Sequence, residues 1–448
     1  MTSVTESIWR FAAGLEFAQL PSEVQDSARD RLLDALSTAI AARDVPTTRA
    51  VLAASAGLDP SGPCTVLPTA ASASVSDAVL VNGTAIHAIL YEDINLVSSD
   101  HPGPVIVAAA LGAAEACAAL TGRDGDIESL LTGIVAGYEV HLALGRVAAS
   151  GVKARGLRTT AIFGTVSAAV ASARILGLAE SQFRSAIALG ANMSFGFLEG
   201  FAHGTMEPYV QAGLAARAGI LATLLGRSGV ATADVAFEGA HGYLRGLADV
   251  VEPVALDLGT DWHMRGVTAK PYPISGAKIG PVDSARAAHE IGYDPADIDR
   301  VVVRLKPGIK EFPGADVPGP FTSMNQAQDS TQFCVAAALL GRDMASLQTV
   351  MRKFADHEIE ALAPRIELVS EPGRTLTRVD VHLHGGAVVT GEVDWTDRQV
   401  PTIASMSTKL RTLSEGFWRT GVVDAVIEVI CGPTAAPMHS LTRLLRAT

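Results

Sequence analysis

Helical stretches built from alanine, glycine and small aliphatic residues constrain the fold of this chain more than any other feature. Two of them read GTVSAAVASARILGL (164–178) and GLAARAGILATLLG (213–226). Small side chains let helices approach closely, because the distance between helix axes depends on the side chains at the contact. Aromatic residues make up 5% of the chain and hydrophobic residues 48%, so small aliphatics must form the core. These features predict a closely packed, mainly helical protein.

The apolar spacing that is typical of helices recurs over both ends of the chain. Pro21-Ser22 separates two helices near the N-terminus. The segment 57–70 is rich in glycine, proline, serine and threonine, so we expect a loop there. Helices are expected within 7–43 and at 74–90, 103–121, 125–149, 160–177, 179–191, 208–226 and from about 403 onward.

The pattern changes after about residue 262, where apolar and polar residues alternate as they do in strands. Strands are expected at 298–307, 363–372 and 377–395, with Gly385-Gly386 at a hairpin turn, and helices at 281–291, 327–341 and 343–352. We therefore predict a large all-helical domain built from both chain ends, with an inserted α+β domain. The expected boundaries are 1–267 and 403–448 for the helical domain and 268–402 for the insert.

Charge and composition argue against several partners. The net charge is −12 and no basic block occurs, which argues against nucleic acid and anionic membranes. The most apolar run, 105–120, contains Glu115 and is shorter than a bilayer requires, so we expect no transmembrane span. The N-terminus lacks the basic and apolar regions of a signal peptide, so we expect a cytoplasmic location.

Familiar metal and nucleotide motifs are missing from the sequence. The four cysteines are scattered without a C-x-x-C pair, which argues against disulfides and structural zinc. No G-x-G-x-x-G follows a strand, and neither a phosphate-binding P-loop nor a G-x-S-x-G motif occurs. The histidines of HLH (382–384) could share a metal, but no third ligand is visible, so we expect no metal.

The stretch HAILYEDINLVSSDHPG (87–103) places a tyrosine, carboxylates and a histidine between two apolar helices. It could be a solvated loop, or an active-site loop held by rigid elements. His101 precedes a proline, which favours an extended backbone before the next helix. A histidine at a helix start could be a neutral base, or could only cap the helix.

Other polar breaks carry candidate binding groups. Glu207, Tyr209 and Gln211 could face a cleft at a helix start, or could simply decorate that helix. Arg158 precedes an apolar helix and could clamp a carboxylate, although such arginines often supply only surface charge.

The stretch TAKPYPISGAKIGP (268–281) contains two prolines around Tyr272. They predict a rigid turn. Lys270 and Lys278 lie beside it. The alternative is an interdomain hinge with solvated lysines.

The order of these stretches resembles the MmgE/PrpD family. VNGTAIHAILYEDINLVSSDHPG is similar to its N-G-x-x-x-H-x-x-D-[FY]-D-D…H-P segment, and GTMEPYVQAGLAARAG, AKPYPISGAKIGP and AQDSTQFCVAAALL resemble three later motifs. The resemblance covers nearly the whole chain. It implies a helical domain with an α+β lid domain, an active site between them, a homodimer, and neither metal nor organic cofactor. It also implies chemistry that begins with removal of a proton next to a carboxylate.

Several positions depart from the family motifs. His101 and Lys270 are kept, whereas the family's aspartate falls on Leu90 and one histidine falls on Arg158. The lysine of a later family motif falls on Pro208, the histidine of the same motif falls on Gln211, and the tyrosine of another motif falls on Phe333. These changes remove cationic and donor groups, and poorly paired carboxylates are costly to bury. We therefore expect a substrate that is less charged than citrate and more apolar.

The resulting hypothesis is a cofactor-independent lyase or isomerase acting on a small carboxylic acid or carbonyl compound, possible reactions being dehydration, decarboxylation or epimerisation. His101 is the expected acid or base, since histidine suits either role near neutral pH. The expected catalytic partners are Tyr91, Glu92 and Asp93, and the expected substrate-binding residues are Leu90, Arg158, Glu207, Gln211, Lys270, Tyr272 and Phe333. Two alternatives stay open: a cyclase or rearrangement enzyme driven by pocket shape, and a non-catalytic binding paralogue.

Overall fold

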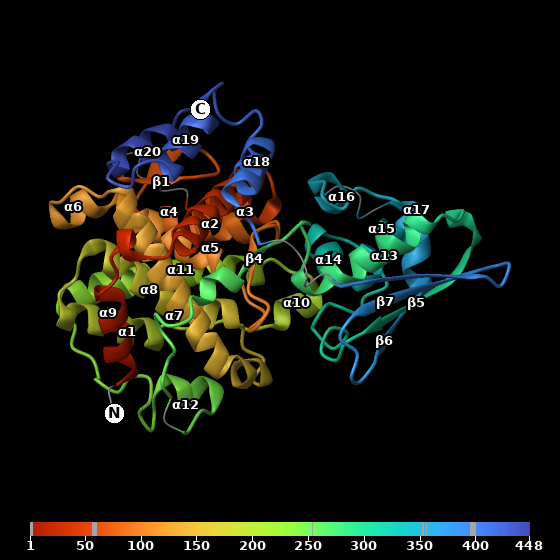
Figure 1. Cartoon of the computed structure of the whole chain (residues 1–448), viewed down its shortest axis with the longest axis horizontal. Coiled ribbons are helices and arrows are strands. Elements are labelled where there is room, and N and C mark those ends of the chain that lie inside the picture. Colours follow the sequence, from red (N-terminus) through yellow and green to blue (C-terminus); the bar gives the residue numbers. More distant parts are fainter. Residues whose placement is uncertain (1–2, 56–60, 253, 352–353, 355, 395–399) are drawn as a thin grey trace.

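The computed structural model describes residues 3–55, 61–252, 254–351, 354, 356–394 and 400–448. Its helices and strands form a larger helical unit and a smaller α+β unit, which lie side by side (Figure 1). Each unit has its own hydrophobic core. The core of the larger unit draws on residues from near both chain ends.

The larger unit contains most of the helices. Helices from the C-terminal end of the chain pack against helices from its N-terminal part: α18 packs on α2, and α20 packs on α5 (Figure 1). Its helices are α1 (Val4–Ala13), α2 (Ser22–Ala41), α3 (Pro46–Ala54), α4 (Val75–His87), α5 (Gly103–Glu115), α6 (Cys117–Thr121), α7 (Ile127–Ala154), α8 (Thr159–Leu176), α9 (Glu180–Asn192), α10 (Glu199–His203), α11 (Glu207–Arg227), α12 (Tyr243–Ala248), α18 (Ile403–Leu413), α19 (Val422–Cys431) and α20 (Met438–Leu445).

The smaller unit is built on a four-stranded sheet with the order β6-β5-β7-β8. The β5–β6 pair is parallel and the other two pairs are antiparallel. Helix α13 packs against β7, β8 and α15. The elements are α13 (Ile279–Ile291), β5 (Ile298–Leu305), α14 (Met324–Asp329), α15 (Thr331–Leu339), α16 (Leu347–Met351), α17 (His357–Leu362), β6 (Ile366–Ser370), β7 (Thr377–Leu383) and β8 (Val388–Val393).

Two short strand pairs lie outside this sheet. Strands β1 (Cys64–Val66) and β2 (Ala71–Ala73) form an antiparallel pair. Strand β3 (Asp93–Ile94) pairs with β4 (Thr268–Ala269), which joins the loop after α4 to the segment that leads into the smaller unit.

A close contact between α4 and α11 depends on glycine. A Cβ atom on Gly213 would lie 2.2 Å from the carbonyl oxygen of Leu80 and 2.4 Å from Oγ1 of Thr84. A Cβ atom on Gly83 would lie 2.8 Å from Cα of Gly213. Because the helices touch backbone to backbone, the end of α4 lies beside the start of α11.

Three helices, α7, α8 and α11, are long and apolar enough to cross a membrane by length and composition. The expectation of no transmembrane span rests on the run 105–120 alone and does not take these three helices into account. In the structure their most apolar windows are 89%, 94% and 67% buried within the protein. Their apolar character is therefore used largely in the packing of the helical core.

The predicted mainly helical fold is confirmed, as are the strands of the smaller unit and the hairpin at Gly385-Gly386. The prediction of a loop at 57–70 is wrong at 64–66, where β1 forms a strand too short to give a periodic pattern. Residues 57–60 of that prediction lie outside the described residues. The helix expected at 343–352 begins only at Leu347.

Candidate functional site

The loop between α4 and α5 is held by contacts with distant segments. The β3–β4 pairing sets Asp93 opposite Ala269, so that Lys270 follows directly beside the loop. The side chain of Gln328 in α14 donates hydrogen bonds of 2.8 Å to the carbonyl oxygens of both Ile89 and Pro273. The loop is thus fixed from both units.

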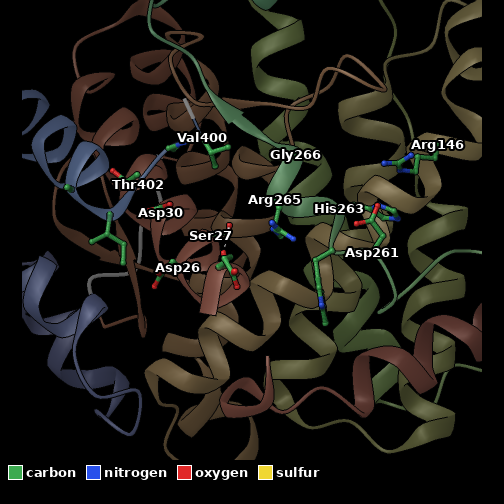
Figure 2. A pocket seen from close by; sticks show the side chains of 15 residues that line it. Asp26, Ser27, Asp30, Arg146, Asp261, His263, Arg265, Gly266, Val400 and Thr402 are labelled. Atoms are coloured by element: carbon green, nitrogen blue, oxygen red, sulfur yellow. Dashed lines mark hydrogen bonds and ion pairs between the residues drawn. The ribbon is translucent and has the colours of Figure 1, made fainter. Parts of the chain in front are cut away.

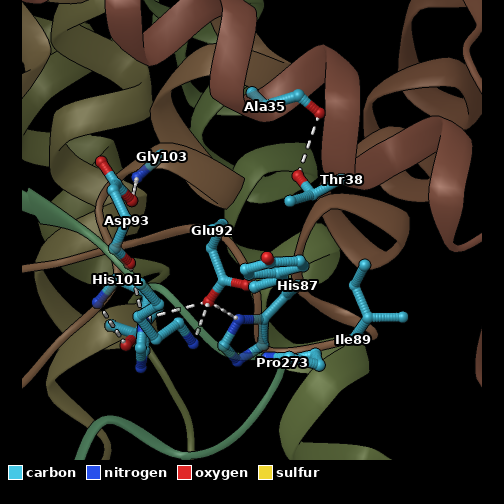
Figure 3. A network of polar contacts seen from close by, with 12 residues as sticks. Ala35, Thr38, His87, Ile89, Glu92, Asp93, His101, Gly103 and Pro273 are labelled. Carbon is cyan, nitrogen blue, oxygen red and sulfur yellow. Dashed lines mark hydrogen bonds and ion pairs between the residues drawn. The ribbon is translucent and has the colours of Figure 1, made fainter. Parts of the chain in front are cut away.

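Glu92 is the centre of a buried polar cluster (Figure 3). Its Oε1 atom lies 2.8 Å from Nδ1 of His87, 3.0 Å from Nδ1 of His101 and 3.3 Å from Nζ of Lys270. Burial alone would raise the pKa of Glu92, but Lys270 and the two histidines hold it well below its usual value. Glu92 is therefore a carboxylate, and its Oε2 atom has no hydrogen-bond partner among the described residues.

His87 connects Glu92 to Arg158. Its Nε2 atom contacts Nη2 of Arg158, and a guanidinium can only donate. Nε2 must therefore accept, and Nδ1 carries the proton that is donated to Glu92. Burial, with the charge of Arg158 opposing protonation, lowers the pKa of His87 to about 3. His87 is neutral, and both of its nitrogens are occupied.

His101, unlike His87, has one ring nitrogen without a hydrogen-bond partner among the described residues. Its Nδ1 atom lies 2.8 Å from the carbonyl oxygen of Asp93, which only accepts, so Nδ1 carries a proton. Its backbone N–H is fixed by Oγ1 of Thr160 at 3.1 Å. In the neutral ring Nε2 then keeps its lone pair, and no described residue forms a hydrogen bond to it. The side chain is 12% exposed, the most accessible in the Glu92 cluster.

The carboxylate of Asp93 is engaged away from this imidazole. It accepts from the hydroxyl of Tyr138 at 2.6 Å and from the backbone N–H of Gly103 at 3.1 Å. Burial raises its pKa. Asp93 therefore fixes the start of α5 and uses its main-chain carbonyl to orient His101.

Arg158 is buried and cationic. Its Nη1 atom donates to Oε1 of Gln211 at 3.4 Å, and Nε2 of Gln211 donates to the carbonyl oxygen of Phe197 at 3.0 Å. Burial lowers the pKa of Arg158 to about 10, which leaves it protonated near neutral pH. Neither hydrogen-bond partner of this guanidinium is a carboxylate, so Arg158 can still bind an anionic group of a ligand.

A second polar group joins α11 to α14. The hydroxyl of Tyr209 donates to Oδ2 of Asp329 at 3.1 Å, and the rings of Tyr209 and His87 lie 5.7 Å apart. Burial, partly offset by Lys278, raises the pKa of Asp329 to about 6. Oδ1 of Asp329 and Nζ of Lys278 have no hydrogen-bond partner among the described residues.

The loop itself has an unusual backbone. Leu90 has φ of 50°, which is uncommon for a residue other than glycine and occurs at functional sites. The next residue, Tyr91, is held by Lys409 of α18. Nζ of Lys409 donates to the carbonyl oxygen of Tyr91 and lies 4.1 Å from the centroid of its ring. Lys409 also forms a 2.6 Å ion pair with Asp34.

His87, Glu92 and His101 could in principle hold a metal ion, since their ligand atoms all lie within 4.8 Å of one another. The protonation pattern does not favour it, because the Nδ1 atoms that face Glu92 both carry protons. Lys270 and Arg158 also place two positive charges against the same group. The cluster is therefore better suited to an anionic ligand.

A cavity with a volume of about 750 Å³ lies elsewhere. Figure 2 shows it at the start of α2, next to residues 261–266 and the segment before α18. A second cavity of about 380 Å³ is lined by Tyr272 and Arg286. Neither is lined by a residue of the Glu92 cluster, which is closed between the two units.

The structure brings together five of the predicted site residues: Glu92, His101, Arg158, Gln211 and Lys270. Leu90, Tyr91 and Asp93 shape the loop through their backbone or through contacts on its far side. Three predicted binding residues lie outside the cluster. Glu207 is exposed, Tyr272 contacts Asp283 and Arg286, and Phe333 packs on Phe321 within the core of the smaller unit.

Sequence reasoning missed the central role of His87, although it is the histidine of the N-G-x-x-x-H motif. It also missed Asp329, for which we find no local signal in the sequence. Lys278 was noted only as a cation beside a proline turn.

Comparisons with known proteins agree with this architecture. The MmgE/PrpD N-terminal domain matches residues 6–253, and the MmgE/PrpD C-terminal domain matches residues 272–416. Cis-aconitate decarboxylase of Aspergillus terreus is 26% identical over 293 residues, which cover 63% of this chain and 59% of that enzyme. A cis-aconitate decarboxylase-like protein of Aspergillus oryzae, oryM, is 23% identical over 382 residues, covering 80% of this chain and 77% of that protein.

The match to the Aspergillus terreus decarboxylase thus spans less than two thirds of its length. The two domain matches, in contrast, cover most of this chain and follow each other in order. Strand β4 and Lys270, which pair with the loop that carries Glu92, lie between the two matched ranges. With both domains present, this chain belongs to the MmgE/PrpD family.

Proposed function

We propose that this chain is a cofactor-independent lyase or isomerase that removes a proton next to a carboxylate. The observation that carries the proposal is the free Nε2 lone pair of His101, held in a cluster with two buried cations, Arg158 and Lys270. The relatives that are decarboxylases by name support a lyase.

Each group has a role in this scheme. Arg158 and Lys270 bind the substrate carboxylate, and Nε2 of His101 takes the proton from the neighbouring carbon. Negative charge then develops on the carboxylate oxygens, where fixed cations in a water-poor site are most effective. Glu92, 3.0 Å from Nδ1 of His101, stabilises the imidazolium that forms.

Hydroxide can then leave from the adjacent carbon and take up a proton as water, which completes a dehydration, or a proton can return on the other face, which completes an epimerisation. In a decarboxylation of an unsaturated acid, the imidazolium of His101 returns the proton to the far carbon of the double bond, carbon dioxide leaves, and the carbon that keeps the electron pair takes up a proton from solvent. Access to the buried cluster requires the two units to separate, so the smaller unit acts as a lid. The expected substrate carries fewer charges than citrate, because Pro208 and Gln211 stand where the family motifs have a lysine and a histidine.

The test is solvent deuterium exchange. Cis-aconitate, 2-methylcitrate and iminodisuccinate are incubated with the protein in D₂O containing EDTA, and deuterium at the carbon next to a carboxylate is measured by NMR. His101→Ala is expected to reduce exchange or turnover roughly 10²- to 10⁴-fold. His203→Ala serves as the control, because His203 is an exposed histidine, with 66% of its side chain accessible.

Other outcomes point to the alternatives. A modest loss in His101→Ala would favour a reaction driven by pocket shape. Thermal stabilisation by these acids without exchange or turnover would favour a binding protein. Rapid turnover of 2-methylcitrate would contradict the expectation of a less charged substrate.

A further inference from the structure

Lys278 is a buried cation that the scheme above leaves unused. It ends the 3-10 helix η3 (Gly276–Lys278) and directly precedes α13. The residue is fully buried, and Nζ has no hydrogen-bond partner among the described residues. An unpaired buried ammonium is costly, so burial lowers the pKa of Lys278, and an anion from outside the chain would favour the charged form.

Lys278 and Arg158 each lie against one ring of a pair of contacting phenylalanines. Nζ of Lys278 lies 5.4 Å from the ring centroid of Phe312, and the guanidinium of Arg158 lies 5.1 Å from that of Phe201. The two rings meet edge to face with centroids 5.3 Å apart. The two buried basic side chains therefore lie against two rings that are in contact, and neither side chain forms an ion pair with a described carboxylate.

The nearest candidate for a partner within the chain is Asp329. Its charge interacts with that of Lys278, but no ion pair forms between them, and Oδ2 is engaged by Tyr209. Nζ of Lys278 therefore lacks the hydrogen-bonded counter-charge that an anionic ligand would supply.

We propose that Lys278 binds a second anionic group of the substrate, at the far end of the molecule from the carboxylate held by Arg158. The ligand is then a dicarboxylate whose carbon chain crosses the rings of Phe201 and Phe312. This assignment rests on the proposed function, since it takes Arg158 as the anchor for the reacting end.

The experiment compares matched acids by calorimetric titration. Succinate is paired with butyrate, and glutarate with pentanoate, so that each pair differs in one carboxylate. The wild type is expected to bind one dicarboxylate at least about tenfold more tightly than its partner. Lys278→Met should reduce that preference to near unity while leaving butyrate or pentanoate binding unchanged. Lys278→Arg should keep most of it.

Lys306→Met is the control, since Lys306 is an exposed lysine of the same unit. A wild type without a dicarboxylate preference, or a preference that survives in Lys278→Met, overturns the proposal. A fall in melting temperature with an unchanged preference would identify Lys278 as a structural partner of Asp329 instead. Thermal melting of each variant therefore accompanies the titration.

The titration requires no turnover, so the two proposals can fail separately. A protein that binds dicarboxylates through Lys278 but exchanges no proton refutes the reaction alone. A protein that exchanges protons with no effect of Lys278→Met on selectivity refutes the assignment of Lys278 alone.

Discussion

Glu92→Gln should be among the most damaging single substitutions in this protein. The change keeps the size of the side chain but removes the charge that Lys270 faces at 3.3 Å. At an effective dielectric constant of 20, two unit charges at this separation attract by about 5 kcal/mol. Removing one partner of a buried pair typically costs about 3–5 kcal/mol, because the other charge stays buried. We expect a loss of about 3–5 kcal/mol in the free energy of unfolding.

The measurement is urea unfolding followed by tryptophan fluorescence at pH 7.5. In Glu92→Gln/Lys270→Met no charge of this pair remains, so the double variant should be more stable than the two single losses predict. Glu207→Gln is the matched control and should change stability by less than about 0.5 kcal/mol, because Glu207 is exposed. A loss below 1 kcal/mol in Glu92→Gln, or additive losses in the double variant, would refute the account of the cluster.

Three further perturbations test other parts of the structure. Lys409→Met should lower kcat about tenfold with little change in KM, because Lys409 holds the backbone of Tyr91 from behind; an equal rise in KM would contradict a positioning role. Gly213→Ala should destabilise the protein by about 1–3 kcal/mol in urea unfolding, because its Cβ has no room, whereas Gly246→Ala, with open space around it, should not; equal effects would contradict the close helix contact. Burial raises the pKa of Asp30 to about 7, so the stability due to its neutral form is present below its ordinary pKa of 3.8 and is lost as the pH rises through 7. Asp30→Asn should therefore add about 1–3 kcal/mol above pH 8 and almost nothing at pH 3, and a gain independent of pH would contradict this.

The sequence predicted those parts of the fold that have a local signal. Strand β5 is rich in β-branched residues over 298–305, and the Gly385-Gly386 turn marks the hairpin of β7 and β8. The two-residue strand β3 has no such signal, and its partner β4 follows about 175 residues later along the chain. The contact that fixes the site could therefore not be predicted from the local pattern.

The candidate site was predictable where a charged residue broke an apolar pattern, as at Glu92 and His101. It was not predictable where burial comes from contacts between distant segments. Asp329 meets Tyr209 across a sequence separation of 120, and charged residues such as Lys278 are expected on the surface unless packing buries them. His87 closes an apolar helix, where its position indicates core packing as readily as function.

The tautomer of His101 decides whether a base is available at Nε2, on which the proposed reaction depends. It can be measured by ¹⁵N NMR of histidine-labelled, ligand-free protein at pH 8, with the His101 signals assigned by their loss in His101→Ala. We expect the neutral form of the ring to carry its proton on Nδ1, hydrogen-bonded to the Asp93 carbonyl, and a lone pair on Nε2. A proton on Nε2 of the neutral ring would contradict it.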